Sequence, residues 1–253
     1  MNSWKDSGRV ALITGAGKGI GQATAIAFAS AGARVVLSGR SEEPLAHTLA
    51  LIEKAGGEVV MLVGDVSEEA TAQKAVSLAI EQFGQLDFAV NNAGISPWVG
   101  NTAECSLQDW QQVINTNLTG TWLGMKYQIP AMVRSGGGAI VNMSSVAALA
   151  AFAGYCPYSA TKWAIVGITK VAAKEFAGQN IRVNAIAPGS IDTPLFADVV
   201  QSTPNSREDY EQQTPMKRIA RPEEVAAAAV WLCSDGASYV TGTLLPVDGG
   251  STL

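Results

Sequence analysis

A tyrosine and a lysine, Tyr158 and Lys162, stand four residues apart in the segment YSATK. In a helix this spacing places two side chains on one face, and Pro157 is tolerated in a first helical turn. An ammonium group favours a neighbouring phenolate, so we expect Lys162 to lower the pKa of Tyr158 from about 10. Such a phenol can exchange a proton with a carbonyl or an alcohol. The spacing alone is equally typical of a solvated surface pair.

Two further polar residues stand where regular structure is expected. Ser145 ends a short apolar run, AIVNMSS, that is typical of a buried strand, so its hydroxyl would lie at a strand end. Asn115 and Asn117 interrupt a helical pattern that runs from Ser106 to about Val133. Asn competes for backbone hydrogen bonds inside a helix. We therefore expect either a local bulge with a functional side chain or an ordinary surface position.

A glycine-rich turn, GAGKGIG, follows the apolar run VALIT at 10–14 and opens into a helical pattern. In a strand, turn and helix of this kind, glycines let the backbone approach a ligand and the helix start favours a pyrophosphate. Glycine-rich turns also occur for steric reasons alone. Because Gly15, Gly19 and Gly21 have the right context, they predict a dinucleotide site.

The next strand pattern, ARVVLSGR, ends where the adenosine ribose of a dinucleotide would lie. An acidic side chain there would bind the ribose hydroxyls and repel a 2′-phosphate. The chain has Gly39 and Arg40 instead, and Lys18 lies within the glycine turn. Each cation taken singly could be a solvated surface charge. Together, without a carboxylate, they favour NADP(H) over NAD(H).

Three other strand patterns end in residues suited to the ligand-binding edge of an open parallel sheet. EVVMLVGD ends at Asp65, which would accept a hydrogen bond from adenine or cap the next helix. LDFAVNNAG leads into Asn91, Asn92, Ala93 and Gly94, although Asn and Gly are also common turn formers. NIRVNAIAPG ends at Pro188 and Gly189.

Strand and helix patterns alternate along the whole chain. We predict one domain over residues 1–253, an α/β fold with a Rossmann-type doubly wound parallel β-sheet of about seven strands flanked by helices. The length of 253 residues and the 47% hydrophobic composition allow such a core to be buried. Residues 190–215 are polar and contain prolines, so we expect an irregular segment that is a mobile substrate-binding lid or a disordered insertion.

Composition excludes several classes of partner. The net charge of −5 and the scattered Lys and Arg residues argue against nucleic acid and anionic membranes. The opening MNSWKDSGRV lacks an apolar stretch of signal-peptide length, and no apolar run approaches the roughly 18 residues of a membrane helix. We expect a soluble, cytoplasmic protein. Cys105, Cys156 and Cys233 are expected to be reduced packing residues, and the single histidine, His47, argues against a metal site.

The chain closely resembles the classical branch of the short-chain dehydrogenase/reductase family over essentially its whole length. The motifs that carry the resemblance have the order and spacing of that family, and they are TGAGKGIG at 14–21, NNAG at 91–94, Asn117, Ser145, YSATK at 158–162 and PGSIDT at 188–193.

The resemblance implies a role for each catalytic residue. Tyr158 would be the general acid in reduction and the general base in oxidation. Lys162 would bind the nicotinamide ribose and lower the pKa of Tyr158. Ser145 would hydrogen-bond the substrate oxygen, and Asn117 would hold a water molecule in a proton relay. No metal is needed for this chemistry.

The resemblance also implies which residues surround the NADP(H) cofactor. Lys18 and Arg40 match a pair seen in members that prefer NADPH. The full set comprises the pyrophosphate turn, the adenine contacts, the cleft lining and the nicotinamide contacts, namely Gly15, Gly17, Lys18, Gly19, Ile20, Gly21, Gly39, Arg40, Asp65, Val66, Asn92, Ala93, Gly94, Tyr158, Lys162, Pro188, Gly189, Ile191 and Thr193.

The leading hypothesis is an NADP(H)-dependent carbonyl reductase that is reversible as a secondary-alcohol dehydrogenase. The alternative is a 3-oxoacyl-[acyl-carrier-protein] reductase, although this chain has Gly136 and Gln179 where carrier-docking members present arginines, with Arg134 and Lys174 nearby. A non-catalytic dinucleotide-binding regulator would be expected to have lost the tyrosine or the lysine.

A substrate pocket for a small or medium hydrophobic ketone is expected beside the catalytic residues. Each candidate for its wall could equally serve in core or interface packing. The candidates are Ser145, Trp98, Leu149, Ala150, Phe152, Tyr155 and the 190–215 segment. Classical family members are usually homotetramers that pair through long helices and the C-terminal strand, so the resemblance implies a homotetramer.

Overall fold

The computed structural model describes residue 4, residues 8–96 and residues 98–253. Most of the opening decapeptide, in which we expected no signal peptide, lies outside the described residues, as does Pro97. Within the described part of the chain, one parallel sheet has the strand order β3-β2-β1-β4-β5-β6-β7. Its strands are β1 (Val10–Thr14), β2 (Arg34–Gly39), β3 (Val59–Val63), β4 (Phe88–Asn91), β5 (Gly138–Met143), β6 (Ile181–Pro188) and β7 (Leu244–Val247).

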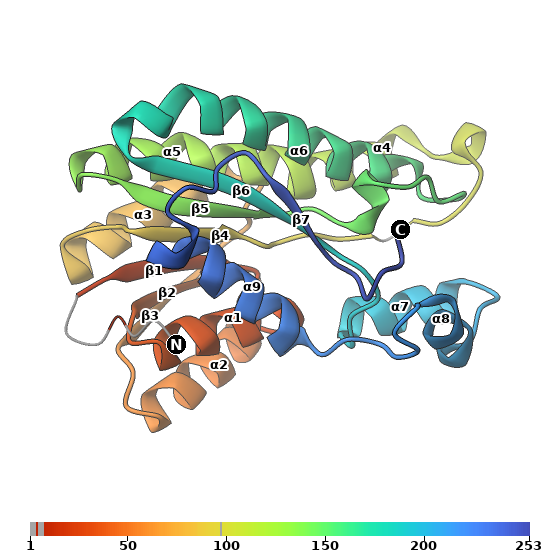
Figure 1. Ribbon diagram of the computed structural model, residues 1–253, viewed down its shortest axis with the longest axis horizontal. Coiled ribbons are helices and arrows are strands. Elements are labelled where there is room, and N and C mark those ends of the chain that lie inside the picture. The colour runs from red at the N-terminus through yellow and green to blue at the C-terminus, as the bar shows by residue number, and fades with distance from the viewer. Residues whose placement is uncertain (1–3, 5–7, 97) are drawn as a thin grey trace.

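Helices cover both faces of the sheet, and two short helices lie apart at one end of the molecule (Figure 1). On one face are α1 (Gly19–Ser30), α2 (Glu42–Lys54) and α9 (Pro222–Cys233), and on the other are α3 (Glu69–Phe83), α5 (Gly120–Arg134) and α6 (Cys156–Phe176). The remaining helices are α4 (Leu107–Val113), α7 (Pro194–Ser202) and α8 (Arg207–Gln213), with 3₁₀ turns at Thr102–Glu104, Val146–Ala148, Ala177–Gln179 and Asp235–Ala237. Among the described residues, no helix is long and apolar enough to cross a membrane.

The first strand shows why the sheet has two cores. Ala11 and Ile13 pack with α1 and α9, whereas Val10 and Leu12 pack with α3 and α5. Successive side chains of a strand face opposite sides, and here both sides are covered by helices. This explains why the sequence of β1, VALIT, is apolar throughout. The predicted doubly wound parallel sheet is confirmed.

The strand order reverses between β1 and β4. From β1 the chain winds outward through β2 and β3, and it then returns to the other side of β1 to build the rest of the sheet. Loops at such a switch point diverge and leave a crevice beyond the carboxyl ends of the strands. The glycine turn follows β1 and residues 92–94 follow β4, so the two motifs flank this crevice.

The prediction of an irregular 190–215 segment is wrong, because α7 and α8 lie within it. Thr193 Oγ1 caps α7 by accepting a hydrogen bond from the Phe196 N–H (3.2 Å). Ser206 and Asp209 form a reciprocal capping box at the start of α8. The spacing of Ser206 and Asp209 was a visible signal for a helix start.

The helical pattern from 106 to 133 is divided by a π-helical segment, Ile114–Thr119, between α4 and α5. A bulge was one of the two expected explanations for the asparagines here. Asn117 is fully buried within it, whereas Asn115 is exposed. The expected bulge is therefore present around Asn117 and the expected surface position applies to Asn115, while a functional role of Asn117 stays a prediction.

Candidate active site

A cleft crosses the carboxyl ends of the strands as two adjoining cavities. A cavity of about 280 Å³ lies over the glycine turn and the ends of β2 and β3. A second cavity, of about 240 Å³, lies over the ends of β5 and β6 and the start of α6. The residues that line both are Ile20, Asn92, Gly94, Thr193 and Leu195.

The glycine turn forms an open backbone cradle in the first cavity. Gly15 and Gly19 have φ angles of +64° and +57°, which side chains with a Cβ rarely adopt. A Cβ atom on Gly21 would overlap the carbonyl oxygen of Gly15. The turn therefore closes tightly onto the start of α1, where a pyrophosphate would meet backbone N–H groups. The shape and the donors fit a dinucleotide.

Asn92 and Thr14 fix the two loops of the switch point to each other. Asn92 Nδ2 donates to the Thr14 carbonyl oxygen (2.9 Å). Thr14 Oγ1 accepts from the backbone N–H groups of Asn92 (3.0 Å) and Ala93 (3.1 Å). Asn92 therefore lines the cleft and also links the loop after β4 to the end of β1.

Two cations stand at the mouth of the first cavity. Lys18 and Arg40 line it, both are exposed, and neither forms an ion pair with any described residue. No carboxylate side chain belongs to the described lining of this cavity. Its electrostatics therefore favour an anionic group near the end of β2.

Asp65 turns away from this lining. Its Oδ1 accepts hydrogen bonds from the Ser67 N–H (2.9 Å) and the Ser67 hydroxyl (2.8 Å). The residue that caps α3 is Glu68, so the expectation that Asp65 caps the helix is wrong. Gly64 and Val66, on either side of it, line the cavity. The contact of Asp65 with adenine stays a prediction.

The start of α6 places the candidate catalytic pair in the second cavity. Tyr158 and Lys162 lie one turn apart, and the Lys162 Nζ atom is 5.2 Å from the centre of the Tyr158 ring. Lys162 Nζ donates to the carbonyl oxygen of Met143 (2.9 Å), which ties α6 to the end of β5. Ser145 lines the same cavity and interacts with the Tyr158 phenol. Tyrosine, lysine and serine therefore meet at one point, as their sequence positions suggested.

Burial dominates the electrostatics of this pair. It raises the pKa of Tyr158 above its usual value, and the hydrogen bond from Ser145 opposes that rise. Burial also lowers the pKa of Lys162 to about 8. The prediction that Lys162 lowers the pKa of Tyr158 is wrong for this structure, because burial raises that pKa and the opposing interaction comes from Ser145.

The adjacent serines have different tasks. Ser144 Oγ donates to the backbone carbonyl of Lys162 (2.9 Å) and so secures α6 against β5. Ser145 instead interacts with the Tyr158 phenol and accepts from the Ala147 N–H (3.1 Å). Only Ser145 is placed to meet a substrate oxygen beside the tyrosine.

Asn117 clamps the loop after β4. Its Oδ1 accepts from the Ile95 N–H (2.8 Å) and its Nδ2 donates to the Ile95 carbonyl (2.9 Å). The same Nδ2 lies 3.3 Å from Thr161 Oγ1, which in turn donates to the Tyr158 carbonyl (2.7 Å). The side chain therefore positions both the cleft loop and α6, and the water relay stays a prediction.

The chain is similar to known proteins over nearly its whole length. A family described as enoyl-(acyl carrier protein) reductase matches residues 15–252. Cyclohexanol dehydrogenase from Acinetobacter sp. (strain SE19) is 40% identical over 248 residues, which cover 98% of this chain and 96% of that protein. The chain belongs to the classical short-chain dehydrogenase/reductase family. It is therefore an oxidoreductase.

Solved structures of this family superimpose closely. The 3-ketoacyl-(acyl-carrier-protein) reductase from Brucella melitensis complexed with NADH has a TM-score of 0.91 and 34% identity, and covers 99% of this chain and 100% of its own. A variant of actinorhodin polyketide ketoreductase with NADPH has a TM-score of 0.93 and 36% identity, and covers 96% of this chain and 97% of its own. The fold thus occurs with either nicotinamide cofactor.

The residues expected around the cofactor gather along the cleft, with Asp65 as the exception. The first cavity is lined by Gly15, Gly17, Lys18, Gly19, Ile20, Gly21, Gly39, Arg40, Val66, Asn92, Ala93 and Gly94. The second is lined by Tyr158, Lys162, Pro188, Gly189, Ile191 and Thr193, of which Thr193 lines both.

The expected substrate pocket needs correction at three positions. Trp98, Leu149 and Ala150 lie outside the lining of the second cavity, whereas Phe152 and Tyr155 belong to it. The Trp98 indole packs over Gly100, and Leu149 is 39% exposed. These three residues lie close in sequence to the site motifs, but closeness in sequence does not show whether a side chain faces the cavity.

The 190–215 segment was expected to line the pocket, and it does so through α7 and α8, although the sequence did not show which of its residues form the wall. Leu195, Phe196 and Val199 line the cavity from α7, and Tyr210 lines it from α8. The spacing of the three apolar residues is helical, which was a signal in a segment interpreted as irregular. Together with Val146, the three apolar residues of α7 make most of the cavity wall apolar.

Proposed function

We propose that this protein is an NADP(H)-dependent carbonyl reductase, reversible as a secondary-alcohol dehydrogenase, with Tyr158 as the general acid and base. The observation that carries the proposal is the position of the Tyr158 phenol, which interacts with Ser145 and lines an apolar cavity that adjoins the glycine cradle. The similarity to cyclohexanol dehydrogenase supports an alcohol or ketone substrate.

In reduction, a bound nicotinamide cofactor supplies the hydride that reaches the carbonyl carbon. Ser145 orients the substrate by a hydrogen bond to the carbonyl oxygen. Tyr158 delivers the proton to that oxygen, and its raised pKa keeps the phenol protonated at neutral pH. Lys162, held by Met143, keeps the start of α6 against β5 and presents a cation below the ring. Carbon gains the hydride and oxygen gains the proton, so the product is a secondary alcohol.

A panel assay tests this function. Wild-type protein is incubated with NADPH or NADH and with ketones, keto esters and alcohols, and the cofactor absorbance is followed. We expect oxidation of NADPH with apolar ketones such as cyclohexanone. Absence of turnover with every ketone and alcohol of the panel would count against a reductase and in favour of a non-catalytic dinucleotide-binding regulator, although the complete catalytic set argues against that class.

The preference for NADP(H) is supported by Lys18 and Arg40. Both line the first cavity without an ion pair to a described residue, and the described lining contains no carboxylate. In Arg40→Asp we expect the KM for NADPH to rise about tenfold or more, since a charge-assisted bond to a phosphate is lost. The KM for NADH should change much less. The matched charge change Lys170→Asp, on the exposed side of α6, should alter neither value.

A 3-oxoacyl-[acyl-carrier-protein] reductase is the second candidate. The matching family description and the similarity to 3-ketoacyl-(acyl-carrier-protein) reductase favour it. Within one chain, however, Lys174 lies sixteen residues along α6 from Tyr158, which is about 24 Å of helix. Arg134 ends α5, and Gly136 follows it in the turn that leads to β5. Comparing turnover of an acyl thioester with that of a free ketone separates the two candidates.

We also propose that α7 and α8 act as a mobile lid. Residues of both helices line the second cavity. Arg207, at the start of α8, forms a bidentate ion pair with Asp192, which follows β6 (2.9 and 3.0 Å). This pair is the contact that would have to open when the lid moves.

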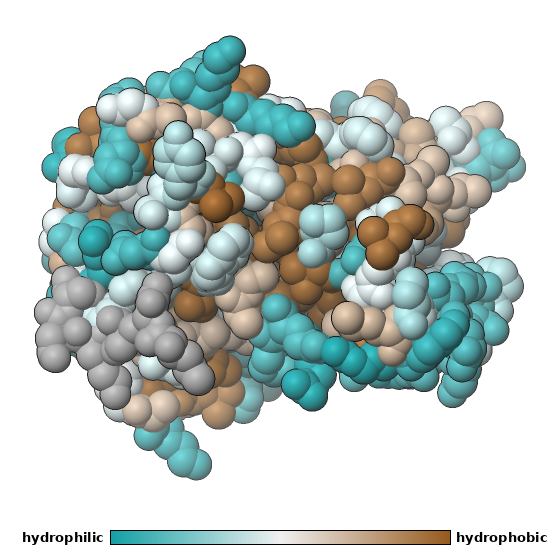
Figure 2. All heavy atoms as spheres, in the orientation of Figure 1, coloured by the Kyte–Doolittle hydropathy of each residue, from teal (hydrophilic) through white to brown (hydrophobic). Residues whose placement is uncertain are grey.

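Homotetramer formation, implied by family membership, is supported by two apolar surfaces. On α5 and α6, Trp122 and Trp163 are 49% and 55% exposed. Figure 2 shows hydrophobic residues gathered near β6 and β7 in the middle of one face, and β7 is an edge strand of the sheet. Light scattering should give four times the chain mass of 26.3 kDa. The cytoplasmic location stays a prediction.

A further inference from the structure

Two hydroxyl groups in the wall of the second cavity have no hydrogen-bond partner. The Ser96 Oγ and Tyr155 phenol oxygens are shielded from solvent and bond to no described residue, and both residues line the cavity. Buried hydroxyls are rarely left unpaired, because they lose their hydrogen bonds to water without replacement. Their position in a cavity wall indicates a ligand group as the missing partner.

Tyr155 lies between the proton donor and the lid. It is the residue that precedes α6, one turn before Tyr158. Burial, and after it the phenols of Tyr210 and Tyr158, raise the pKa of Tyr155. Its hydroxyl is therefore neutral at physiological pH and stands near the catalytic tyrosine on one side and α8 on the other.

Three of the neighbouring polar residues already have partners. The Tyr210 hydroxyl is 3.1 Å from Thr203 Oγ1, and Ser144 is bonded to the α6 backbone. Ser145 and Tyr158 interact with each other and are assigned to the reacting oxygen. The wall thus offers one matched pair for the reacting carbonyl and two separate hydroxyls with nothing to bind.

The charge of the wall restricts what these hydroxyls can bind. Lys162 is the charged residue among the described residues that line the second cavity, and its ammonium is held by the Met143 carbonyl. A carboxylate or phosphate on the substrate would therefore lack a free cation. A neutral oxygen, either a hydroxyl or a carbonyl, fits the hydroxyls of Tyr155 and Ser96.

We propose that Tyr155, assisted by Ser96, recognises a second oxygen on the substrate, so that the preferred substrates are ketones bearing another neutral hydroxyl or carbonyl group. This inference rests on the ketone-reducing function proposed above and narrows it. Hydroxyketones and diketones are the predicted class, and simple hydrocarbon ketones are secondary substrates.

The test compares matched substrates in matched variants. Wild type, Tyr155→Phe and Tyr210→Phe are assayed with cyclohexanone, 4-hydroxycyclohexanone and the cyclohexane-1,2-, 1,3- and 1,4-diones. Phe keeps the ring and removes one oxygen. For the wild type we expect kcat/KM to be about tenfold higher for at least one dioxygenated ketone than for cyclohexanone. Tyr155→Phe should remove that advantage, because the KM for the dioxygenated ketones should rise more than the KM for cyclohexanone.

The Tyr210→Phe control removes a hydroxyl that already has a partner. This variant should change kcat/KM for cyclohexanone and for the dioxygenated ketones by the same factor. Ser96→Ala should reproduce the direction of the Tyr155→Phe effect at smaller size. A wild type that prefers cyclohexanone, or equal losses on both substrate types in Tyr155→Phe, would overturn the proposal while leaving the reductase function intact.

A binding measurement separates failure of recognition from failure of catalysis. Cyclohexane-1,4-diol is titrated calorimetrically into Tyr158→Phe and into the double variant that also carries Tyr155→Phe, both loaded with NADP⁺. We expect the Kd to rise about five- to tenfold in the double variant. If no ketone is reduced, the proposed function fails. An unchanged Kd would then overturn the role of Tyr155 as well, whereas a raised Kd would support that role.

Discussion

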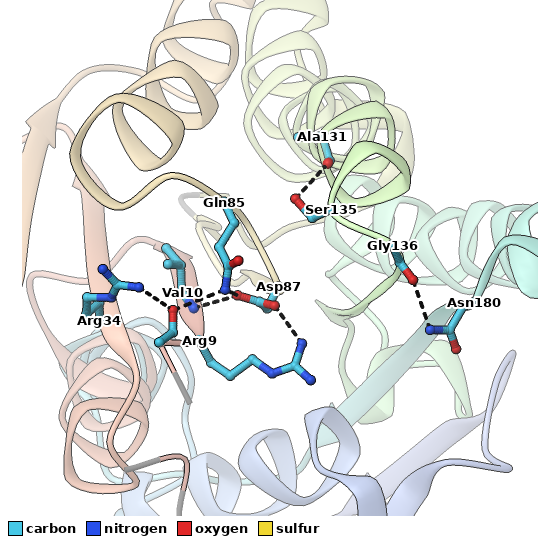
Figure 3. Close-up of polar contacts among 10 residues, drawn as sticks. Arg9, Val10, Arg34, Gln85, Asp87, Ala131, Ser135, Gly136 and Asn180 are labelled. Carbon is cyan, nitrogen blue, oxygen red and sulfur yellow. Dashed lines mark hydrogen bonds and ion pairs between the residues drawn. The ribbon is translucent and has the colours of Figure 1, made fainter. Parts of the chain in front are cut away.

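The buried polar groups are hydrogen-bonded more completely at the amino ends of the strands than at their carboxyl ends. At the amino end, the carboxylate of Asp87 is 2% exposed and fully paired. Its Oδ1 accepts from Arg9 Nη1 (2.6 Å), and its Oδ2 accepts from the Val10 N–H (2.8 Å) and from Gln85 Nε2 (2.9 Å). Figure 3 shows these groups converging on the carboxylate where β1 and β4 begin.

Other bonds in the same view close the loops at this end (Figure 3). Arg34 Nη2 donates to the Gly8 carbonyl (2.5 Å), and Asn180 Nδ2 donates to the Gly136 carbonyl (3.1 Å). The second bond joins the turn before β5 to the turn before β6. The amino end is therefore mainly a stabilising network, in which the Arg34 Nε atom has no hydrogen-bond partner among the described residues.

The carboxyl end keeps its polar groups incompletely paired. Lys162 is buried with a carbonyl partner and without an ion pair to any described residue. Tyr155 and Ser96 have no partner. Stability and ligand binding thus depend on different ends of the same strands, since a group that must meet a ligand cannot also be fully satisfied by the protein.

The largest expected effect removes the proton donor at the carboxyl end. Tyr158→Phe should lower kcat by about 10²–10⁴-fold, because general acid catalysis contributes that much. The Kd for NADPH and the free energy of unfolding should change little. Tyr239→Phe, which alters a fully exposed tyrosine, should keep the wild-type rate. A Tyr158→Phe enzyme with most of its activity would show that another group supplies the proton.

The corresponding change at the amino end should affect stability and spare catalysis. Asp87→Asn replaces an acceptor with an NH₂ group that faces donors, so the free energy of unfolding should fall by about 2–4 kcal/mol. Urea denaturation measures this, and kcat of the folded variant should match the wild type. Glu53→Gln makes the same carboxylate-to-amide change on the exposed side of α2 and should have almost no effect. Equal loss of kcat in Asp87→Asn would contradict the separation of the two ends.

The third effect concerns pH and the buried lysine. The pKa of Lys162 is lowered from 10.5 to about 8 in the folded state. Between these values the unfolded chain binds more protons than the folded one, so stability rises with pH across this window.

Denaturation at pH 7.5 and pH 9.5 measures this contribution. The unfolding free energy of the wild type should increase by about 2 kcal/mol relative to that of Lys162→Met. Lys170→Met, on the exposed side of the same helix, should follow the wild type. If the difference between the wild type and Lys162→Met stays constant with pH, Lys162 is charged throughout this range.

The smallest effect concerns the lid. The Asp192–Arg207 pair is exposed, so Arg207→Gln should change the unfolding free energy by less than about 1 kcal/mol and raise the KM for ketone by up to about fivefold. High salt should bring the wild-type KM toward that of the variant. Arg218→Gln breaks a comparable bidentate pair with Glu224 away from the lid and should leave KM unchanged. A KM shift of the same size in Arg218→Gln would mean that the Arg207 pair does not control the lid.

Local patterns predicted most of the framework. The apolar run of β1, the glycine turn and the start of α6 at Cys156 appear where the residue types placed them, because strand burial, positive φ angles and helix starts depend on near neighbours. The helices at 190–215 were hidden by polar, proline-bearing composition, although Ser206 and Asp209 carried a capping signal.

The amino-acid sequence by itself determined which side chains the proposed chemistry would use, because the spacing of Tyr158 and Lys162 places them on one helix face and Ser145 follows the strand beside it. Tertiary structure alone decided the state of those groups. Burial raises the pKa of Tyr158 against the expected direction, and packing leaves Tyr155 in the cavity wall without a partner while turning Trp98 away. Desolvation and hydrogen-bond satisfaction depend on every element around a group, and no local stretch of sequence contains that information.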